Sequence, residues 1–282
     1  MSDSRVHVWW ILLCCAAALN LLLWFGSARQ LLTSAPAGQA SSGRHWHLWL
    51  SLVYVVVCGF RSVLPRADVE RLCLFDTWLS SVALGRTLAT VAEMACVLQW
   101  ALLLREYGQA ARIRWVKRAS LVSIVLIAFA EVCSWYAVLS THFLGNVLEE
   151  SCWALLGLIV AVCLSRLWVS ADEGLRRPLA GGILLSLSYF CFMAFVDVPM
   201  YLRRMQESVA RGHVPLSLHA GWEDALSRRV VSWDWSQWSP EVPWMTLYFT
   251  AAVWVMLLLS HAPVWTGRGE EYVRSTSTPE RS

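Results

Sequence analysis

Long apolar segments alternate with polar connections along this chain of 282 residues. Seven of the segments are long enough to cross a bilayer as a helix, which takes about 20 apolar residues. We therefore predict an all-α integral membrane protein whose bundle of about seven transmembrane helices forms one domain over residues 1–266. Residues 267–282 are polar and are predicted to form a disordered cytoplasmic tail. The predicted spans are residues 8–25, 46–64, 82–104, 119–141, 147–168, 179–202 and 242–261.

Composition places the chain in the membrane class. Hydrophobic residues make up 57% of it, which is too much for a soluble core of ordinary proportions. We expect the lipid bilayer as its partner, a small polar or lipid molecule as a candidate ligand, and no nucleic acid or cofactor. The nine cysteines show no metal-ligand spacing, so neither a metal site nor a disulfide framework is predicted. The oligomeric state and the membrane, plasma membrane or endomembrane, stay open.

Positive charge predicts the orientation. Lysine and arginine gather in the first, third and fifth connections, and connections of this kind face the cytoplasm. The fourth connection, 141–146, has no Lys or Arg, and the second and sixth balance their cations with acidic residues. We therefore predict an N-terminus outside, a C-terminus in the cytoplasm, and a first helix that is retained and not cleaved as a signal. The basic residues of the three connections are Arg29, Arg44, Arg105, Arg112, Arg114, Lys117, Arg118, Arg166, Arg176 and Arg177.

Ionisable residues within the spans are the best functional clue. A charge at membrane depth costs about 2.5 to 3.5 kcal/mol, so such residues usually face a protein-lined or watery interior. At 100° per residue, Arg86 and Glu93 lie two turns apart on one face of the third span. The candidate binding or proton-relay set is Arg86, Glu93, Glu131, Glu149, Glu150 and Asp197.

The predicted topology puts most of this set in the outer third of the membrane, with Glu93 and Glu131 nearer the middle. The set therefore describes a funnel that narrows inward from the exoplasmic surface. Five carboxylates and one arginine cannot all be ionised in a space of low dielectric constant, so some should be protonated near neutral pH. Glu131, opposite Glu93 and below Asp197, is the group that we expect to exchange protons. The alternative is that Arg86 pairs with the acids only to pin helices together.

Tryptophans gather before the last span. The segment 203–241, between spans six and seven, is exoplasmic in the predicted topology and ends in a Trp-rich stretch. Tryptophans at a span entrance are typical of an interfacial belt, and the alternative is a lid or recognition loop over a cavity. A second segment, 61–81, is predicted to form a short amphipathic helix after Pro65. The candidate lid or recognition residues are Trp135, Trp153, Trp233, Trp235 and Trp238.

Two well-known classes of seven-helix protein are excluded at the residue level. A retinal Schiff base needs a lysine in the last helix, whereas the only lysine, Lys117, lies in a loop. The third span ends in Arg105-Glu106-Tyr107, unlike the acidic-Arg-aromatic triplet of G-protein-coupled receptors, and the last span has no Asn-Pro pair. Motifs of metalloproteases, nucleophile elbows and phosphate loops are also absent from the sequence. These residues point to no known family.

Three functions remain open. The first is a protein that binds or transports a polar, cationic or protonatable small molecule in an acidic cavity facing the exoplasm. The second is an intramembrane lipid-modifying enzyme, with a carboxyl as general acid or base and Arg86 holding a phosphate or carboxylate. The third is a non-catalytic structural subunit of a membrane complex. The hydroxyl groups near the acids lack a histidine at a suitable spacing, so the sequence favours binding or transport.

Overall fold

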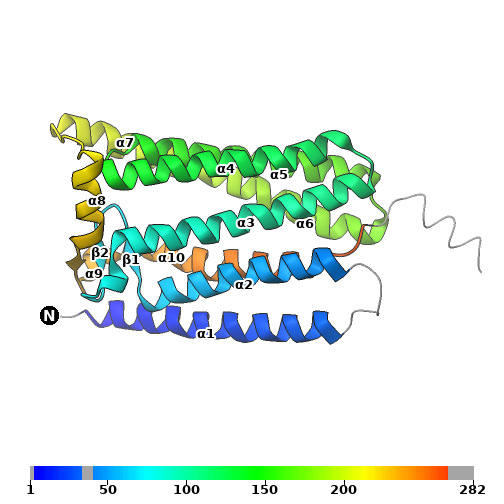
Figure 1. Cartoon of the computed structure of the whole chain (residues 1–282), viewed down its shortest axis with the longest axis horizontal. Helices are drawn as coiled ribbons and strands as arrows, with labels where there is room; N and C mark the ends of the chain where they lie inside the picture. The colour runs from blue at the N-terminus through cyan, green and yellow to red at the C-terminus, as the bar shows by residue number, and fades with distance from the viewer. Residues whose placement is uncertain (1–2, 34–40, 266–282) are drawn as a thin grey trace, which may run out of the picture.

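Seven long helical spans form an antiparallel bundle in the computed structural model, which describes residues 3–33 and 41–265 (Figure 1). Each span is long and apolar enough to cross a membrane, which confirms a multi-pass membrane protein at this level. Several helices run beyond the predicted spans, because hydropathy marks only the part that lies in hydrocarbon. The predicted disordered tail, 267–282, lies outside the described residues.

The first five spans are continuous α-helices. The chain between α4 and α5 is only a few residues long, and Thr141 in it adopts a φ of 58°. That left-handed conformation stops a helix and reverses the chain, so α4 and α5 become antiparallel neighbours. The five helices are α1 (Ser4–Thr33), α2 (Ser41–Val63), α3 (Val82–Ala110), α4 (Arg114–Ser140) and α5 (Leu144–Ser170).

The sixth and seventh spans each contain a π-helical segment. In the sixth, Pro199 follows this segment and has no N–H to donate to the preceding turn, which accounts for the widened turn there. The sixth span consists of α6 (Glu173–Phe192), the π segment Met193–Asp197 and α7 (Val198–Ala210). The seventh consists of α10 (Val242–Leu247), the π segment Tyr248–Ala252 and α11 (Val253–Ser260).

A polar side chain of α1 supports the π segment of the seventh span. Asn20 Nδ2 donates to the carbonyl oxygen of Phe249 at 2.8 Å, and Trp254 Nε1 donates to Asn20 Oδ1 at 3.0 Å. A carbonyl in a widened helical turn needs such a partner inside a membrane, where water is scarce. Asn20 therefore holds the first and seventh spans together.

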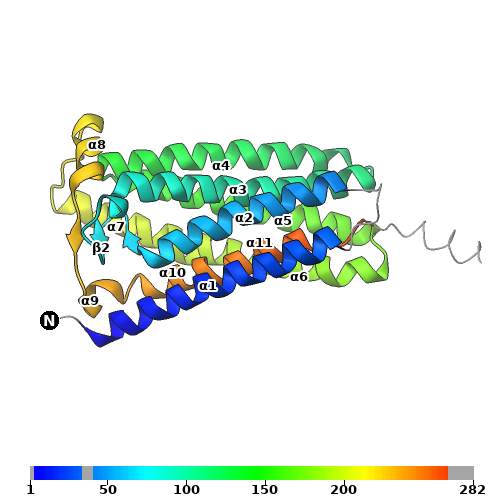
Figure 2. The same ribbon diagram turned by 60° about the horizontal axis from the view of Figure 1, so that its bottom comes forward.

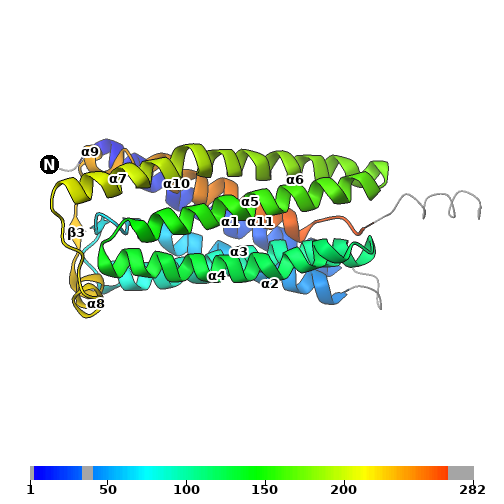
Figure 3. The same ribbon diagram turned by 90° about the horizontal axis from the view of Figure 1, so that it is seen from above.

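Helices that follow one another in the chain pack side by side from α1 to α6. The seventh span closes the bundle against α2, α1 and α3, whereas α6 packs chiefly on α5 and lies at the rim (Figure 3). Many leucine and aromatic side chains of α6 are exposed, as suits a helix that faces lipid. The interior of the bundle thus lies between α2, α3, α4, α5 and the seventh span.

The two ends of the bundle differ. At one end, here called the cap end, the connections after α2 and α7 fold into a small cap, while the other end, the basic end, carries the α1–α2, α3–α4 and α5–α6 connections (Figures 1 and 2). In the cap, β2 pairs antiparallel with β1 and parallel with β3. The cap consists of β1 (Arg66–Ala67), β2 (Leu72–Cys73), a 3-10 turn (Trp78–Ser80), α8 (Leu218–Ser227), β3 (Val230–Val231) and α9 (Trp235–Trp238).

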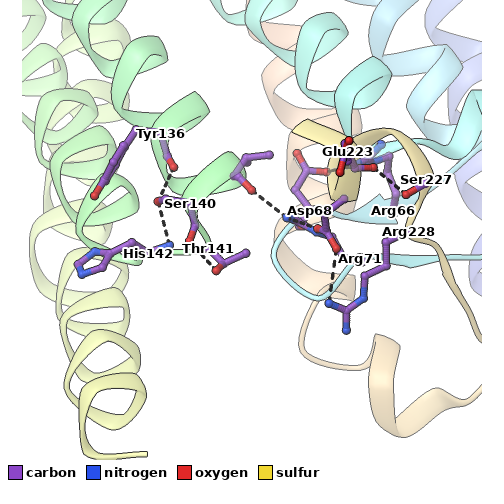
Figure 4. A network of polar contacts seen from close by, with 12 residues as sticks. Arg66, Asp68, Arg71, Tyr136, Ser140, Thr141, His142, Glu223, Ser227 and Arg228 are labelled. Atoms are coloured by element: carbon purple, nitrogen blue, oxygen red, sulfur yellow. Dashed lines mark hydrogen bonds and ion pairs between the residues drawn. The ribbon is translucent and has the colours of Figure 1, made fainter. Parts of the chain in front are cut away.

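The prediction of an amphipathic helix within 61–81 is wrong, because short strands lie there instead. Arg71 has a φ of 57°, which interrupts a right-handed helix. Its buried guanidinium donates to Asp224 Oδ2 at 2.8 Å and to the carbonyl oxygens of Asp68 at 2.7 Å and Val138 at 2.8 Å (Figure 4). These bonds to distant parts of the chain override the local apolar periodicity.

Helix α8 lies across the cap end of α3 and α4. A Cβ atom at Gly221 would collide with the carbonyl oxygen of Leu139, so only glycine permits this close approach. Helix α8, in the connection before the last span, is therefore packed on the bundle.

Candidate functional site

Arg86 of α3 lies at the centre of three glutamates. Its Nη2 is 2.6 Å from Glu93 Oε2 and 2.8 Å from Glu131 Oε2, and its Nη1 is 3.4 Å from Glu149 Oε1. The side chains of Arg86, Glu131 and Glu149 are each less than 10% exposed, and that of Glu93 is 12% exposed. These four residues, from α3, α4 and α5, are called the acid cluster below. Four of the six residues predicted from the sequence thus lie together.

Local sequence explains how three helices meet at this point. Arg86 and Glu93 are seven residues apart, so two helical turns bring them to one face of α3. On α5, Gly145 lies so close to α4 that a Cβ atom there would be 2.7 Å from Ala137 Cβ. Glu149 follows Gly145 by one turn, and the close packing of α4 and α5 places its carboxylate beside Arg86.

A second set of polar groups surrounds the acid cluster. Thr90 Oγ1 donates to Glu131 Oε2 at 2.6 Å and accepts a hydrogen bond of 3.2 Å from Trp135 Nε1. Tyr248 of the seventh span donates from its hydroxyl to Glu93 Oε1 at 3.4 Å. Trp135 also lies 6.0 Å, between ring centroids, from Trp222 of α8. The cap is therefore in contact with a chain of hydrogen bonds that ends at Glu131.

Not every polar atom of the cluster is satisfied by protein. Glu131 Oε1 and Arg86 Nε are buried and have no hydrogen-bond partner among the described residues. Glu93 Oε2 and Glu131 Oε2 both contact Nη2 of Arg86, so the two carboxyl groups are close and repel each other unless one of them carries a proton. Buried polar atoms of this kind are costly unless a proton, water or ion completes their bonding.

Glu150 and Asp197 lie apart from Arg86. Glu150 is half-buried on the face of α5 next to that of Glu149, and Asp197 is half-buried at the end of the first π segment. The two carboxyl groups are close enough to repel each other electrostatically. They extend the acidic region from the cluster toward α7, while Arg204 is the cation that acts on Asp197.

The cap supplies further charges beside the cluster. The guanidinium of Arg66 packs against Gly85, where a Cβ atom would be 2.6 Å from its Nε, and its Nη2 is 2.8 Å from Asp68 Oδ1. Burial by itself would raise the pKa of Asp68, but the neighbouring guanidiniums of Arg66, Arg61 and Arg86 lower it below its usual value. Asp68 is therefore a permanent anion of the cap at neutral pH.

The five tryptophans predicted as lid or recognition residues lie in different parts of the structure. Of these five, Trp135 is connected to the acid cluster, through its hydrogen bond to Thr90. Trp153 meets Tyr189 of α6 at 6.4 Å, Trp238 is fully buried against Trp9 of α1, and Trp235 lies under Arg5. Trp233 stacks on the ring of His7 at 4.2 Å. Three of the five thus join the cap to α1.

A surface hollow lies at each end of the described bundle. One, of about 230 Å³, lies at the cap end, and the other, of about 200 Å³, lies at the basic end. None of the six predicted site residues lines either hollow, so the predicted funnel above the acids stays a prediction. The first is lined by His142, Phe143, Met205, Ser208, Val209, His213 and Pro215, and the second by Gln30, Leu31, Arg44, His261 and Ala262.

Sequence reasoning missed a buried polar stripe on α2. At 100° per residue its members fall within about 80° of arc, and the 3-4 spacing of polar residues in an apolar helix is the signal that could have found it. All of them are 5% exposed or less. The stripe, called the α2 stripe below, consists of His47, Ser51, Tyr54, Cys58 and Arg61.

Comparisons of the chain with protein-family models, with curated proteins and with solved structures found no match. The geometry of the bundle therefore carries the functional argument alone.

Proposed function

We propose that the acid cluster binds a polar, cationic or protonatable small molecule, and that the protein binds or transports this solute in its membrane. The supporting observation is that Glu93 and Glu131 both contact the same nitrogen, Nη2 of Arg86. Two carboxylates that share one cation in a buried space repel each other. A proton or a bound cation removes this repulsion.

The balance of charge supports the same conclusion. Glu93, Glu131 and Glu149 contact one arginine, and Glu150 and Asp197 extend the acidic region. Arg61 of α2 lies over the ring of Tyr248 at 5.8 Å, and in the described part of the chain it forms no ion pair with these acids. Unbalanced buried charges are costly, so the site favours protons or a cationic group over an anion.

The membrane orientation is part of the proposal. The basic end faces the cytoplasm, because arginine-rich connections stay on that side, and the cap faces outward. A cysteine placed at Gln109, at the basic end, should react with a membrane-impermeant thiol reagent only after permeabilisation. A cysteine placed at Gly212, beyond α7, should react in intact cells. The reverse pattern would invert the orientation of the site.

Binding can be tested by thermal stabilisation of the purified protein in mild detergent. Potassium, ammonium and choline would each be titrated, because a ligand that binds only the folded state stabilises it by about 2.7 kcal/mol at 100 times its Kd. We expect at least one of the cations to raise the melting temperature of the wild type and not that of Glu131→Gln. Glu207→Gln, which alters an exposed glutamate of α7 paired with Arg211, is the matched control and should respond like the wild type. Equal shifts in all three proteins would place binding elsewhere.

A further inference from the structure

The α2 stripe runs along most of one transmembrane helix. Its ends, His47 and Arg61, are 14 residues apart, which corresponds to about 21 Å along the helix axis. The hydrocarbon core of a bilayer is about 30 Å thick. A transmembrane helix can pack through apolar contacts alone. Packing therefore does not explain why α2 carries a buried line of polar side chains of this length.

At the cap end, the stripe meets the acid cluster through Tyr248. The hydroxyl of Tyr248 donates to Glu93 Oε1 at 3.4 Å, and the ring of Tyr248 lies 5.7 Å from that of Tyr54 on α2. Arg61 lies over the same Tyr248 ring. Two tyrosine hydroxyls, each able to donate and to accept, thus stand between Glu93 and the middle of α2.

At the basic end, the stripe reaches a partly exposed carboxylate. Ser51 Oγ lies 3.2 Å from Ser260 Oγ of α11, and Ser260 Oγ also accepts from Gln99 Nε2 at 3.3 Å. One turn from Ser51, His47 Nε2 lies 3.6 Å from Glu106 Oε2, whose side chain is 39% exposed. Among the described residues, Glu106 is the charged group within ion-pair distance of His47, while α11 presents the neutral Ser260.

Several atoms along this line are buried without a partner. Both ring nitrogens of His47 and Oε1 of Gln99 form no hydrogen bond with the described residues. His47 is 4% exposed and Gln99 is fully buried. Buried polar atoms that protein does not satisfy are usually bonded to internal water, and a buried water needs two to four polar partners. His47, Ser51 and Gln99 provide such partners in the half of the stripe nearer the basic end.

We propose that the α2 stripe, with Tyr248, Ser260, Gln99 and Glu106, is a proton path that joins the acid cluster to the basic end. When Glu93 is protonated it donates to the hydroxyl of Tyr248, whose own O–H turns away from Glu93. Each hydroxyl, water or imidazole in turn then accepts a proton on its free lone pair and releases another. The last proton passes from His47 to Glu106 and then to solvent. This inference rests on the proposed function, because it supplies the protons that the acid cluster exchanges.

The path can be tested in liposomes that contain the purified protein and a pH-sensitive dye. A potassium diffusion potential set by valinomycin would drive protons inward. We expect a proton flux above that of protein-free liposomes, and a flux lower by about tenfold in Tyr54→Phe and in His47→Gln, equivalent to about 1.4 kcal/mol in the transfer barrier. Tyr136→Phe and His45→Gln are matched controls on exposed residues, and both should conduct like the wild type.

The infrared carboxyl signal of each variant, titrated in detergent, separates this inference from the proposed function. If the buried carboxyl of the wild type titrates but Tyr54→Phe and His47→Gln conduct protons as well as the wild type, the path is wrong and the site stands. Titration without any wild-type flux would also overturn the path. A wild type with no titrating carboxyl would overturn the proposed function itself. Tyr54→Phe keeps the aromatic ring, so we expect it to fold. An unchanged melting temperature would exclude a folding defect.

Discussion

The acid cluster and the α2 stripe are both buried in the bundle, but they differ in charge and in bonding. The acid cluster, between α3, α4 and α5, holds three carboxylates and a guanidinium within contact distance. The α2 stripe, which faces α3 and the seventh span, has one formal charge along its length, at Arg61, while both regions contain buried polar atoms without partners among the described residues. Dense ion pairing suits a site that holds a ligand, whereas a line of polar groups with few charges suits a route along which protons pass.

The helices also differ in whether polar groups continue from the acid cluster toward the basic end. On α5, the stretch 158–164 toward the basic end is apolar, and Leu164 and Leu167 are buried. On α2 and α3 the same depth carries Ser51 and Gln99. A route from the acid cluster to the basic end therefore follows α2 and α3, because a proton needs polar groups or water at each step.

The largest effect should come from removing the cation of the acid cluster. Arg86→Leu leaves three buried carboxylates without their ion-pair partner, and breaking a buried ion pair in this way costs about 3 to 5 kcal/mol. Thermal or denaturant unfolding in detergent would measure the loss. Arg211→Leu, which breaks only an exposed pair, should stay within about 0.5 kcal/mol of the wild type. Equal stability of Arg86→Leu and the wild type would mean that the acids do not depend on Arg86.

A purely steric change should disturb the acid cluster next most. Gly145→Ala puts a methyl group against Cys133 and Ala137 of α4, which forces α5 outward and carries Glu149 away from Arg86. Overpacking of this kind costs about 1 to 3 kcal/mol. Melting temperature would report it, and the cation-induced shift should shrink as well. Gly26→Ala, where the added Cβ meets no atom within 4 Å, is the control that should not lose stability.

A change in the α2 region should cost much less. Gln99→Leu removes hydrogen bonds to Met256 O and Ser260 Oγ but also removes the unpartnered Oε1, so stability should stay within about 1 kcal/mol of the wild type. Proton flux, in contrast, should fall. Gln109→Leu, at an exposed position of the same helix, is the control for both measurements. A large loss of stability would show that Gln99 is a structural residue and would weaken the contrast between the two regions.

A further effect, read from its pH dependence, concerns the cap. The folded-state pKa of Asp68 lies below its ordinary value of 3.8, so its ion pair with Arg66 stabilises the fold fully above that pH and less as the pH falls through the folded pKa. Melting temperature measured from pH 6 downward should decline below about pH 4. Asp68→Asn should have a lower melting temperature at pH 6 and a flatter profile. A wild-type profile as flat as that of Asp68→Asn would contradict the ion pair.

The spans were predictable because apolar length is a strong local signal, and the contact between Arg86 and Glu93 followed from helical spacing within one element. The structure of the cap was not predictable, because Arg71 is held by Asp224 and Val138, which are far away in the sequence. The approach of Glu149 to Arg86, while the adjacent Glu150 stays apart, depends on how α5 packs at Gly145. The α2 stripe was not predicted because Ser51, Tyr54 and Cys58 leave the span apolar overall, while His47 and Arg61 lie near its ends.

The central claim is that a carboxyl of the acid cluster exchanges a proton, and infrared difference titration of the purified protein tests it most directly. Glu131→Gln keeps the size of the side chain and its capacity to hydrogen bond, but cannot exchange a proton. The account predicts a protonated-carboxyl band that titrates in the wild type and is lost in Glu131→Gln. Glu207→Gln should retain the band. A band that persists unchanged in Glu131→Gln, or a wild type with none, would contradict the claim and leave the acid cluster a structural ion-pair network.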